Sequence, residues 1–200
     1  MPLVPMVIKR SHDGERSMDL YSRLLDERII MVTEPVDSDM ASIIVGQLLY
    51  LASEDSTKDI TMYINTPGGS VTSMWSIIDA MNLVKPDVST IVIGMAASAG
   101  SLILANGAKG KRMALPHAEV MIHQPSINSI GGQASDVEIA ARNILKTKRL
   151  GAQFIADKTG QTFERVERDM DRDNYLSAEE AIEYGIIDRI IDSKLETTKK

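Results

Sequence analysis

The sequence predicts an α/β fold with a mostly parallel sheet, because β-branched segments alternate with helical ones along the first half of the chain. The expected strands cover residues 28–33, 60–64 and 88–93. The expected helices cover residues 37–53, 70–84 and 98–106. Strands and helices that alternate in this order form βαβ units, in which consecutive strands run parallel.

Each of these elements has a local reason. The three strand segments, RIIMVT, ITMYI and VSTIVI, are short, apolar and rich in β-branched residues. The first helix can use Asp37 or Ser38 as its N-cap. The second has apolar residues at helical spacing and ends before Pro86. Those apolar residues are Val71, Met74, Trp75, Ile78 and Met81.

A long helix is expected over residues 133–158. Roughly 26 helical residues at 1.5 Å each span about 39 Å, which exceeds the width of a domain this size, so one end should project. Its apolar side then needs a partner to cover it. The apolar residues are Ile139, Ile144, Leu145, Leu150, Phe154 and Ile155. The alternative is a helix that breaks near Gly151 and folds back on its own core.

The C-terminal part of the chain is expected to contain two short elements. A helix is expected over residues 177–185 and a strand over 186–192. Because no linker, repeat or low-complexity segment interrupts the chain, we expect a single domain over residues 1–200.

Composition excludes several classes of function. The 200 residues carry a net charge of −6, which argues against nucleic-acid binding. The chain has no cysteine, which excludes disulfides, thiolate metal sites and a cysteine nucleophile. No segment reaches the roughly 20 apolar residues that span a bilayer, and the start, MPLVPMVIKR, is unlike a secretion signal. A cytoplasmic location is therefore expected, or an organelle matrix if an import signal has been removed.

Ser98 is the first candidate for chemistry. It lies in GMAASAGSLILA, among small residues, where a strand should turn into a helix. The pattern Ala96-x-Ser98-x-Gly100 is close to the elbow that exposes a nucleophilic serine, and the following helix would direct N–H groups at the site. The alternative is an ordinary serine N-cap on a helix packed against the sheet.

A reactive serine needs a general base, and the chain offers three histidines. His12 lies in a polar turn, and His117 follows a proline in another. His123 ends the alternating segment AEVMIH, at the end of an expected strand, where sheet proteins gather catalytic groups. His123 is the strongest candidate, although a lone histidine is more often a surface or core residue.

Gly68 and Gly69, in INTPGGSV, could let the backbone approach a ligand and offer an N–H group to a developing oxyanion. The alternative is a plain turn. Two phosphate-site interpretations fail. The segment GAKGKR (107–112) does not complete a P-loop, because the pattern would need glycine at position 105, which is Ala105, and serine or threonine at position 112, which is Arg112. The PGGS segment lacks the glycine spacing of a dinucleotide site.

Three segments share a pattern with one known family. They are INTPGGSV, GMAASAGSLILANGAKGKRMALPHAEVMIHQP and ERDMDRDNYLSAEEAIEYGIIDRI. Together they resemble the proteolytic subunits of the Clp protease, the ClpP family, and the resemblance extends from about Leu3 to Asp192. It implies a crotonase-like α/β fold in which residues 133–158 form the projecting handle and residues 1–20 an axial segment near a central pore.

The resemblance also implies roles for individual residues. Ser98 matches the nucleophile and His123 the general base. The residues alone leave Asp169, Asp171 and Asp173 open as the orienting acid, and the family pattern, counted from Tyr175, selects Asp173. Two further pairs are carried over. Gly69 and Ala99 match the backbone oxyanion donors, and Asp171 and Arg172 match a pair that bridges stacked rings.

Two departures from the family pattern are visible. Ala99 replaces the methionine that often follows the nucleophile, which a backbone donor should tolerate. The segment SINSI (126–130) is one residue longer than usual, so substrate preference and ring pairing transfer less directly than the triad.

The implied protein is a serine endopeptidase in two stacked heptameric rings. It would hydrolyse unfolded polypeptides and need no metal or cofactor in this chain, since a partner AAA+ unfoldase would use the ATP. That unfoldase would dock on apolar clefts between subunits, where Tyr63 matches a cleft residue. The alternatives are an inactive or regulatory ring subunit and a crotonase-like acyl-CoA enzyme. An α/β-hydrolase esterase is disfavoured, because the only acid between Ser98 and His123 is Glu119.

Overall fold

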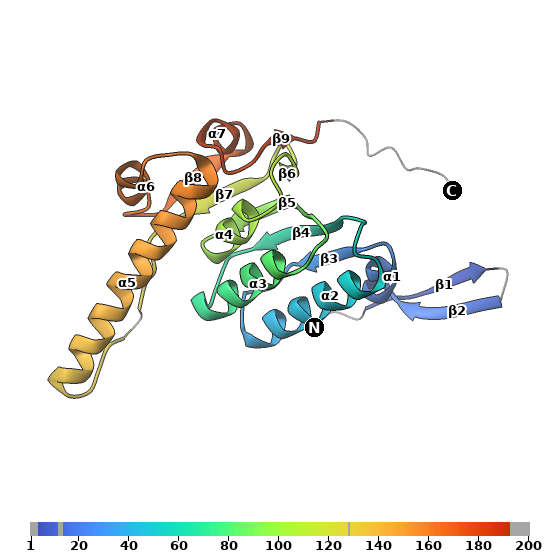
Figure 1. Ribbon diagram of the computed structural model, residues 1–200, viewed down its shortest axis with the longest axis horizontal. Helices are drawn as coiled ribbons and strands as arrows, with labels where there is room; N and C mark the ends of the chain where they lie inside the picture. Colours follow the sequence, from blue (N-terminus) through green and yellow to red (C-terminus); the bar gives the residue numbers. More distant parts are fainter. Residues whose placement is uncertain (1–3, 12–13, 128, 193–200) are drawn as a thin grey trace.

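The computed structural model describes residues 4–11, 14–127 and 129–192, and their main feature is a twisted sheet with helices packed on it (Figure 1). Seven strands in these ranges form that sheet. They are β3 (Ile29–Val32), β4 (Ile60–Thr66), β5 (Val88–Ala97), β6 (Arg112–Ala114), β7 (Glu119–Ile122), β8 (Asn174–Ser177) and β9 (Arg189–Ile190). The order is β3-β4-β5-β6-β9, with β7 beside β5 and β8 beside β7.

Helices connect the strands. They are α1 (Leu20–Asp26), α2 (Ser38–Glu54), α3 (Val71–Leu83), α4 (Ala99–Ala105), α5 (Ala134–Thr159), α6 (Phe163–Asp169) and α7 (Ala178–Tyr184). All strand pairs in the main sheet are parallel except β7–β8. The predicted α/β class with a mostly parallel sheet is therefore confirmed. None of the helices in the described part of the chain is both long and apolar enough to cross a bilayer.

The central strand β5 changes partner along its length. Its first half pairs with β6 and its last residues, Met95–Ala97, pair with β7. The change follows Gly94, whose φ of 106° favours glycine. Asn65 Oδ1 accepts a hydrogen bond from the Met95 N–H at 3.2 Å, and a Cβ on Gly94 would lie 2.7 Å from that oxygen. This irregularity brings the carboxyl end of β5 beside β7.

The core lies between the sheet and α2, α3 and α4, which cover one of its faces (Figure 1). Asp37 is the residue that caps α2, because its Oδ1 accepts the N–H groups of Asp39 and Met40. Ser70 caps α3 in the same way. The largest fully buried side chains come from both layers: Ile30, Ile44, Leu48, Ile60, Met62, Ile64, Ile77, Ile78, Ile103, Leu104, Ile122 and Ile155.

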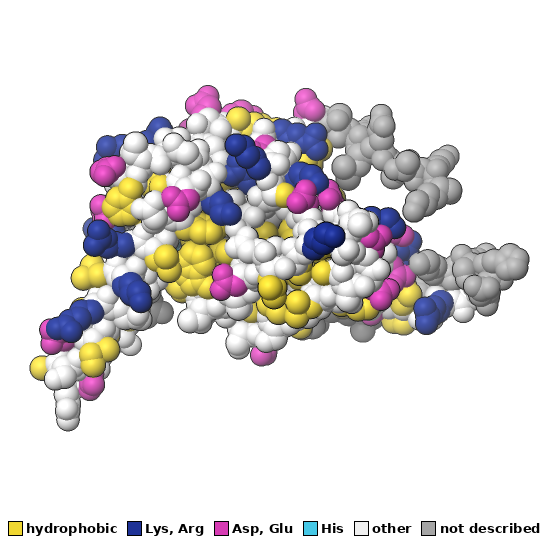
Figure 2. Space-filling view, viewed as in Figure 1, with side chains coloured by type: hydrophobic (Ala, Val, Ile, Leu, Met, Phe, Trp, Pro, Cys, Tyr) yellow, Lys and Arg dark blue, Asp and Glu magenta, His cyan; other side chains and the backbone are white. Residues whose placement is uncertain are grey.

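Helix α5 runs without a break for 26 residues and projects from the sheet at its N-terminal end (Figure 1). The alternative of a helix broken at Gly151 is wrong. Its buried residues, Gly151, Ala152, Ile155 and Ala156, all lie in the last third. Ile139 and Leu145 are 65% and 61% exposed, and apolar side chains are visible along the projecting part at the lower left of Figure 2. An uncovered apolar surface of this kind indicates a partner.

Several elements differ from the sequence predictions. Strand β5 runs four residues beyond the expected end at 93, because it continues past the Gly94 irregularity. The C-terminal strand covers only Arg189–Ile190, since Gly185, with φ 92°, ends α7 and a turn follows it. The N-terminal segment forms a hairpin of β1 (Met6–Ser11) and β2 (Gly14–Asp19) that was not expected. The predicted turn at His12 lies outside the described residues, as does Asn128 of the SINSI segment.

A buried ion pair closes the amino end of the sheet. Arg112 donates to both Asp188 oxygens, at 2.6 Å from Nη2 and 3.1 Å from Nε, and to the Lys158 carbonyl at 3.0 Å. The Arg112 side chain is 8% exposed and that of Asp188 19%. Burial raises the pKa of the Asp188 carboxyl, but the hydrogen bonds from Arg112 outweigh it, so the pKa lies below its ordinary value.

Candidate active site

Ser98 occupies a strained backbone position between β5 and α4. Its φ of 53° and ψ of −118° are unusual for a residue with a side chain. The Ser98 N–H donates to the Met121 carbonyl at 2.9 Å, which holds the turn against β7. Ser98 stands at the N-cap position of α4, but its side chain accepts no capping hydrogen bond. The N-cap alternative therefore does not describe what its hydroxyl does.

The small residues around Ser98 are needed for close packing. A Cβ on Gly68 would lie 2.7 Å from the Ser98 Cβ and from the Ala97 carbonyl oxygen. A Cβ on Gly100 would lie 2.6 Å from Cγ2 of Thr66. Larger residues at either glycine would displace the turn, so the glycines allow the loop after β4 to lie directly against the serine.

His123 reaches the Ser98 hydroxyl from the neighbouring strand. Because β5 and β7 are parallel, with Ala97 opposite Met121, the residues that follow each strand emerge at the same edge of the sheet. His123 Nε2 lies 2.8 Å from Ser98 Oγ, a hydrogen-bond distance. Of the other two histidines, His117 is in an exposed turn and His12 is outside the described residues.

Asp173 completes the arrangement from the antiparallel partner of β7. The β7–β8 register pairs Ile122 with Asn174, so the next residues, His123 and Asp173, face each other. The Asp173 Oδ1 lies 2.9 Å from His123 Nδ1. Its side chain is 58% exposed and that of His123 25%. Of the three candidate aspartates, Asp173 is the one that the structure brings to the histidine.

The other two aspartates of this turn have different surroundings. Asp169 bonds Tyr184, and Asp171 lies 3.7 Å from Lys148 Nζ and 3.8 Å from Nε of its neighbour Arg172. The Arg172 side chain is 90% exposed. Asp171 and Arg172 thus lie on the surface of the turn.

Gln124 ties the histidine strand to the aspartate turn, a contact that the sequence analysis did not identify. Its N–H donates to the Met170 carbonyl at 2.6 Å and its Nε2 to the Asp171 carbonyl at 2.6 Å. Both bonds span the gap between His123 and Asp173. They join the strand that carries His123 to the turn that carries Asp173, and so help to set the distance between these two residues.

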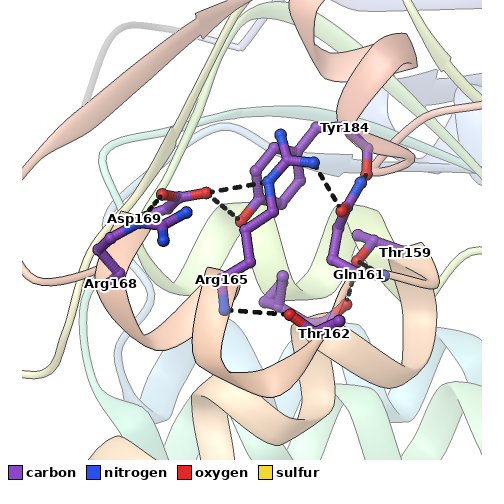
Figure 3. A network of polar contacts seen from close by, with 8 residues as sticks. Thr159, Gln161, Thr162, Arg165, Arg168, Asp169 and Tyr184 are labelled. Atoms are coloured by element: carbon purple, nitrogen blue, oxygen red, sulfur yellow. Dashed lines mark hydrogen bonds and ion pairs between the residues drawn. The ribbon is translucent and has the colours of Figure 1, made fainter.

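A polar network behind this turn holds α6 against α7 (Figure 3). The Tyr184 hydroxyl donates to Asp169 at 3.2 Å, and Arg165 lies 3.4 Å from the same carboxylate and 5.1 Å from the tyrosine ring centre. Arg165 also donates to Gln161, whose amide donates to the Tyr184 carbonyl. Burial, followed by the Asp169 charge, raises the pKa of Tyr184 well above its ordinary value. The phenol therefore stays protonated and available as a donor.

Gly69 and Ala99, the expected oxyanion donors, line one small pocket together with Ser98 and His123. Gly69 forms a bridge with Val36, through hydrogen bonds donated by Val36 and Ser70 that leave the Gly69 N–H out. A Cβ on Gly69 would lie 2.3 Å from the Val36 carbonyl oxygen, so only glycine fits. Ala99 is the first residue of α4, where the N–H has no acceptor within the helix.

Apart from Thr147, the remaining residues that line the pocket beside Ser98 carry no polar side chain. Its further lining residues include Val71, Met74, Trp75, Leu102 and Met170. The Trp75 ring meets the Phe154 ring edge to face at 5.2 Å, which fixes this wall to α5. Among the described residues, no group of three or more His, Cys, Asp or Glu side chains is arranged to hold a metal ion.

The geometry places an alcohol, an imidazole and a carboxylate in series at the carboxyl edge of a parallel sheet. A comparison with protein-family models gives a match to the Clp protease family over residues 12–194. The chain belongs to the Clp protease family. The α/β architecture with its mostly parallel sheet fits the crotonase-like fold expected of that family. Membership supports a peptidase function, and Clp proteases are generally part of ring assemblies with Clp ATPases.

Proposed function

We propose that this Clp protease family member is a serine endopeptidase that hydrolyses peptide bonds of unfolded proteins. The observation that carries the proposal is the pair of hydrogen bonds at His123, 2.8 Å to Ser98 Oγ and 2.9 Å to Asp173 Oδ1. A serine hydroxyl is a weak nucleophile unless a base can remove its proton, and this arrangement provides one. An inactive ring subunit would have no need of the complete set.

The reaction follows from the roles of these groups. His123 Nε2 accepts the Ser98 proton while Oγ attacks the carbonyl carbon of the scissile peptide bond. The imidazolium then gives this proton to the leaving amine as the C–N bond breaks, which leaves an acyl-enzyme ester. Water, deprotonated by the same imidazole, attacks the ester and releases the acid. Asp173 holds the imidazole in the required tautomer and stabilises its charged form.

The backbone would stabilise the charge that develops on the substrate oxygen. In the tetrahedral intermediate the N–H groups of Gly69 and Ala99 would donate to the oxyanion, each lowering the barrier by about 3 kcal/mol. Two features support this role: the Gly69 N–H is not used in the bridge to Val36, and the Ala99 N–H is at a helix start. No metal or nucleotide takes part in the steps proposed for this chain.

We further propose that the subunits assemble as two stacked heptameric rings around a chamber. The exposed apolar residues of the projecting part of α5 support pairing of rings through this helix. The exposed Asp171 and Arg172 would form part of that contact. Residues 1–20 would lie at the axial pore, and a cytoplasmic AAA+ unfoldase of the Clp family would use ATP and dock at clefts that include Tyr63.

Hydrolysis of fluorogenic peptides by the purified protein, together with its mass in solution, tests this function. We expect hydrolysis by a particle of about fourteen subunits and none by Ser98→Ala in particles of the same mass. Undiminished hydrolysis by Ser98→Ala, or a well-folded monomer that persists at high concentration, would contradict the proposal.

A further inference from the structure

Ser101 carries the one polar side chain of α4, and it is fully buried. The other residues of this helix are alanine, glycine, leucine and isoleucine. Alanine would be the less costly residue at position 101, because it has the higher helix propensity and no hydroxyl that loses its contact with water on burial. A serine at this position should therefore have a use for its hydroxyl.

The Ser101 hydroxyl holds the backbone of the proposed nucleophile. Its Oγ donates to the Ser98 carbonyl oxygen at 2.7 Å, and the Ser101 N–H donates to the same oxygen at 3.0 Å. The Ser98 N–H in turn donates to the Met121 carbonyl. A strained backbone persists only where the surrounding structure over-determines it. The bonds to Met121 and Ser101 therefore hold the two peptide planes on either side of Ser98.

The peptide group between Ser98 and Ala99 connects this hydroxyl to the proposed oxyanion site. A trans peptide is planar, so its C=O and N–H point in opposite directions. The Ser98 carbonyl and the Ala99 N–H belong to one such plane, so a donor that fixes the direction of the carbonyl also fixes the direction of the N–H. Ala99 lines the pocket beside Ser98, whereas Ser101 does not. Ser101 can therefore act on the Ala99 N–H without touching a substrate.

We propose that Ser101 is a positioning residue, whose hydroxyl directs the Ala99 N–H at the oxyanion by locking the Ser98–Ala99 peptide plane. This inference rests on the proposed peptidase function. The hydroxyl adds a second donor to a carbonyl that already accepts a backbone N–H, at the residue whose φ and ψ are strained. Preorganised donors stabilise a transition state because they need no reorientation as charge develops. Ser101 therefore contributes to the stability of the transition state and not to substrate binding.

Removing the hydroxyl should lower the rate of hydrolysis without weakening substrate binding. Ser101→Ala should lower kcat for a fluorogenic peptide about tenfold and leave KM within about threefold. The loss should be smaller than the roughly 10²–10³-fold loss that follows complete removal of an oxyanion donor, because the Ala99 N–H remains but is less well directed. Ser101→Cys, whose thiol is a weaker donor, should fall between the two proteins, which keeps the test open if the alanine variant does not fold.

Thr90 offers a matched control at the other end of α4. It is also fully buried, and its Oγ1 donates at 2.9 Å to the Leu104 carbonyl, which accepts the Gly107 N–H at 3.1 Å as well. Thr90→Val therefore removes the same kind of bond from the same helix and leaves a carbonyl with one backbone donor. It should lower the melting temperature at least as much as Ser101→Ala does, and leave kcat within about twofold.

The affinity for a peptide boronate separates this role from a structural one. The boron atom bonds Ser98 Oγ and becomes tetrahedral, with a negative charge and an oxygen in the place of the oxyanion. Its dissociation constant should rise about tenfold in Ser101→Ala and stay within about twofold in Thr90→Val. An unchanged kcat in Ser101→Ala, an equal fall of kcat in Thr90→Val, or an unchanged boronate affinity in Ser101→Ala would overturn the inference. If the unsubstituted protein neither hydrolyses the peptide nor binds the boronate, the proposed function itself fails.

Discussion

The two ends of β5 hold polar groups under opposite conditions. At the carboxyl end Ser98 has a strained backbone, and the Asp173 carboxylate beside His123 is 58% exposed. At the amino end Arg112 and Asp188 have ordinary backbones, are largely buried, and share three hydrogen bonds. One end holds the groups proposed to exchange protons during catalysis, and the other holds a buried ion pair whose hydrogen bonds join β6 to the residue before β9. Of these two ends, the strained backbone is at the one where chemistry is proposed.

The largest effect is expected at the carboxyl end. Asp173→Asn should lower kcat by about 10³-fold or more, because an amide cannot stabilise the imidazolium and favours the wrong histidine tautomer. Peptide hydrolysis under saturating substrate measures it. Asp169→Asn is the matched control, since Asp169 lies just before the same turn and accepts from Tyr184 instead of contacting His123, and it should retain activity within about fivefold in particles of equal mass. The reverse result would show that the acid is misassigned.

The next largest effect is expected at the amino end, on stability and not on the chemistry. Asp188→Asn should lower the free energy of unfolding by about 3 kcal/mol, because it leaves the buried Arg112 without its counter-charge. Urea denaturation at pH 7 measures the loss. Asp87→Asn, which removes an exposed partner of Lys111, should cost less than about 1 kcal/mol. An equal loss of unfolding free energy in Asp188→Asn and Asp87→Asn would show that the buried ion pair stabilises the fold no more than the exposed one.

The same pair gives a pH dependence with a defined sign. The pKa of Asp188 is lowered in the folded protein, so its stabilisation is complete above the unfolded value of about 4. It is lost as the pH falls through the lower folded value. The difference in unfolding free energy between the unsubstituted protein and Asp188→Asn should therefore be constant above about pH 5 and shrink below pH 4. A difference that grows toward acid pH would be inconsistent with a depressed pKa.

The smallest effect is expected from the strain at Ser98. Ser98→Gly should be more stable than Ser98→Ala by about 1 kcal/mol, because glycine relieves a backbone strain of about 1–3 kcal/mol and loses part of that gain to its own flexibility. Both variants lack the hydroxyl, so the comparison isolates the backbone. Thermal unfolding at matched protein concentration measures the difference. Equal stability would show that the turn carries no strain.

The alternation of elements and the position of Ser98 could be predicted from sequence because both depend on local patterns. The segments at 60–64 and 88–93 have strand composition, and each is followed by a segment with helical composition. Ser98 and His123 can each be recognised from the residues next to them in the sequence. Their proximity in space depends on the pairing of β5 with β7 after the irregularity at Gly94, and a single glycine in a strand does not predict which strand pairs with the residues after it.

The orienting acid and the polar ties depend on tertiary register, which residue spacing does not provide. Asp169, Asp171 and Asp173 share one turn, and only the antiparallel pairing of Ile122 with Asn174 sets Asp173 opposite His123. Arg112 and Asp188 are 76 residues apart, and the sequence analysis treated Arg112 as part of a polar turn.

The most direct measurement is to label the assembled protein with a fluorophosphonate and to locate the adduct by mass spectrometry. In the proposed mechanism His123 activates one hydroxyl, so a single adduct at Ser98 is expected, and its formation should be lost in His123→Ala while the particle mass is unchanged. An adduct on another residue, or undiminished labelling of Ser98 in His123→Ala, would contradict the assignment of Ser98, His123 and Asp173 as the catalytic triad.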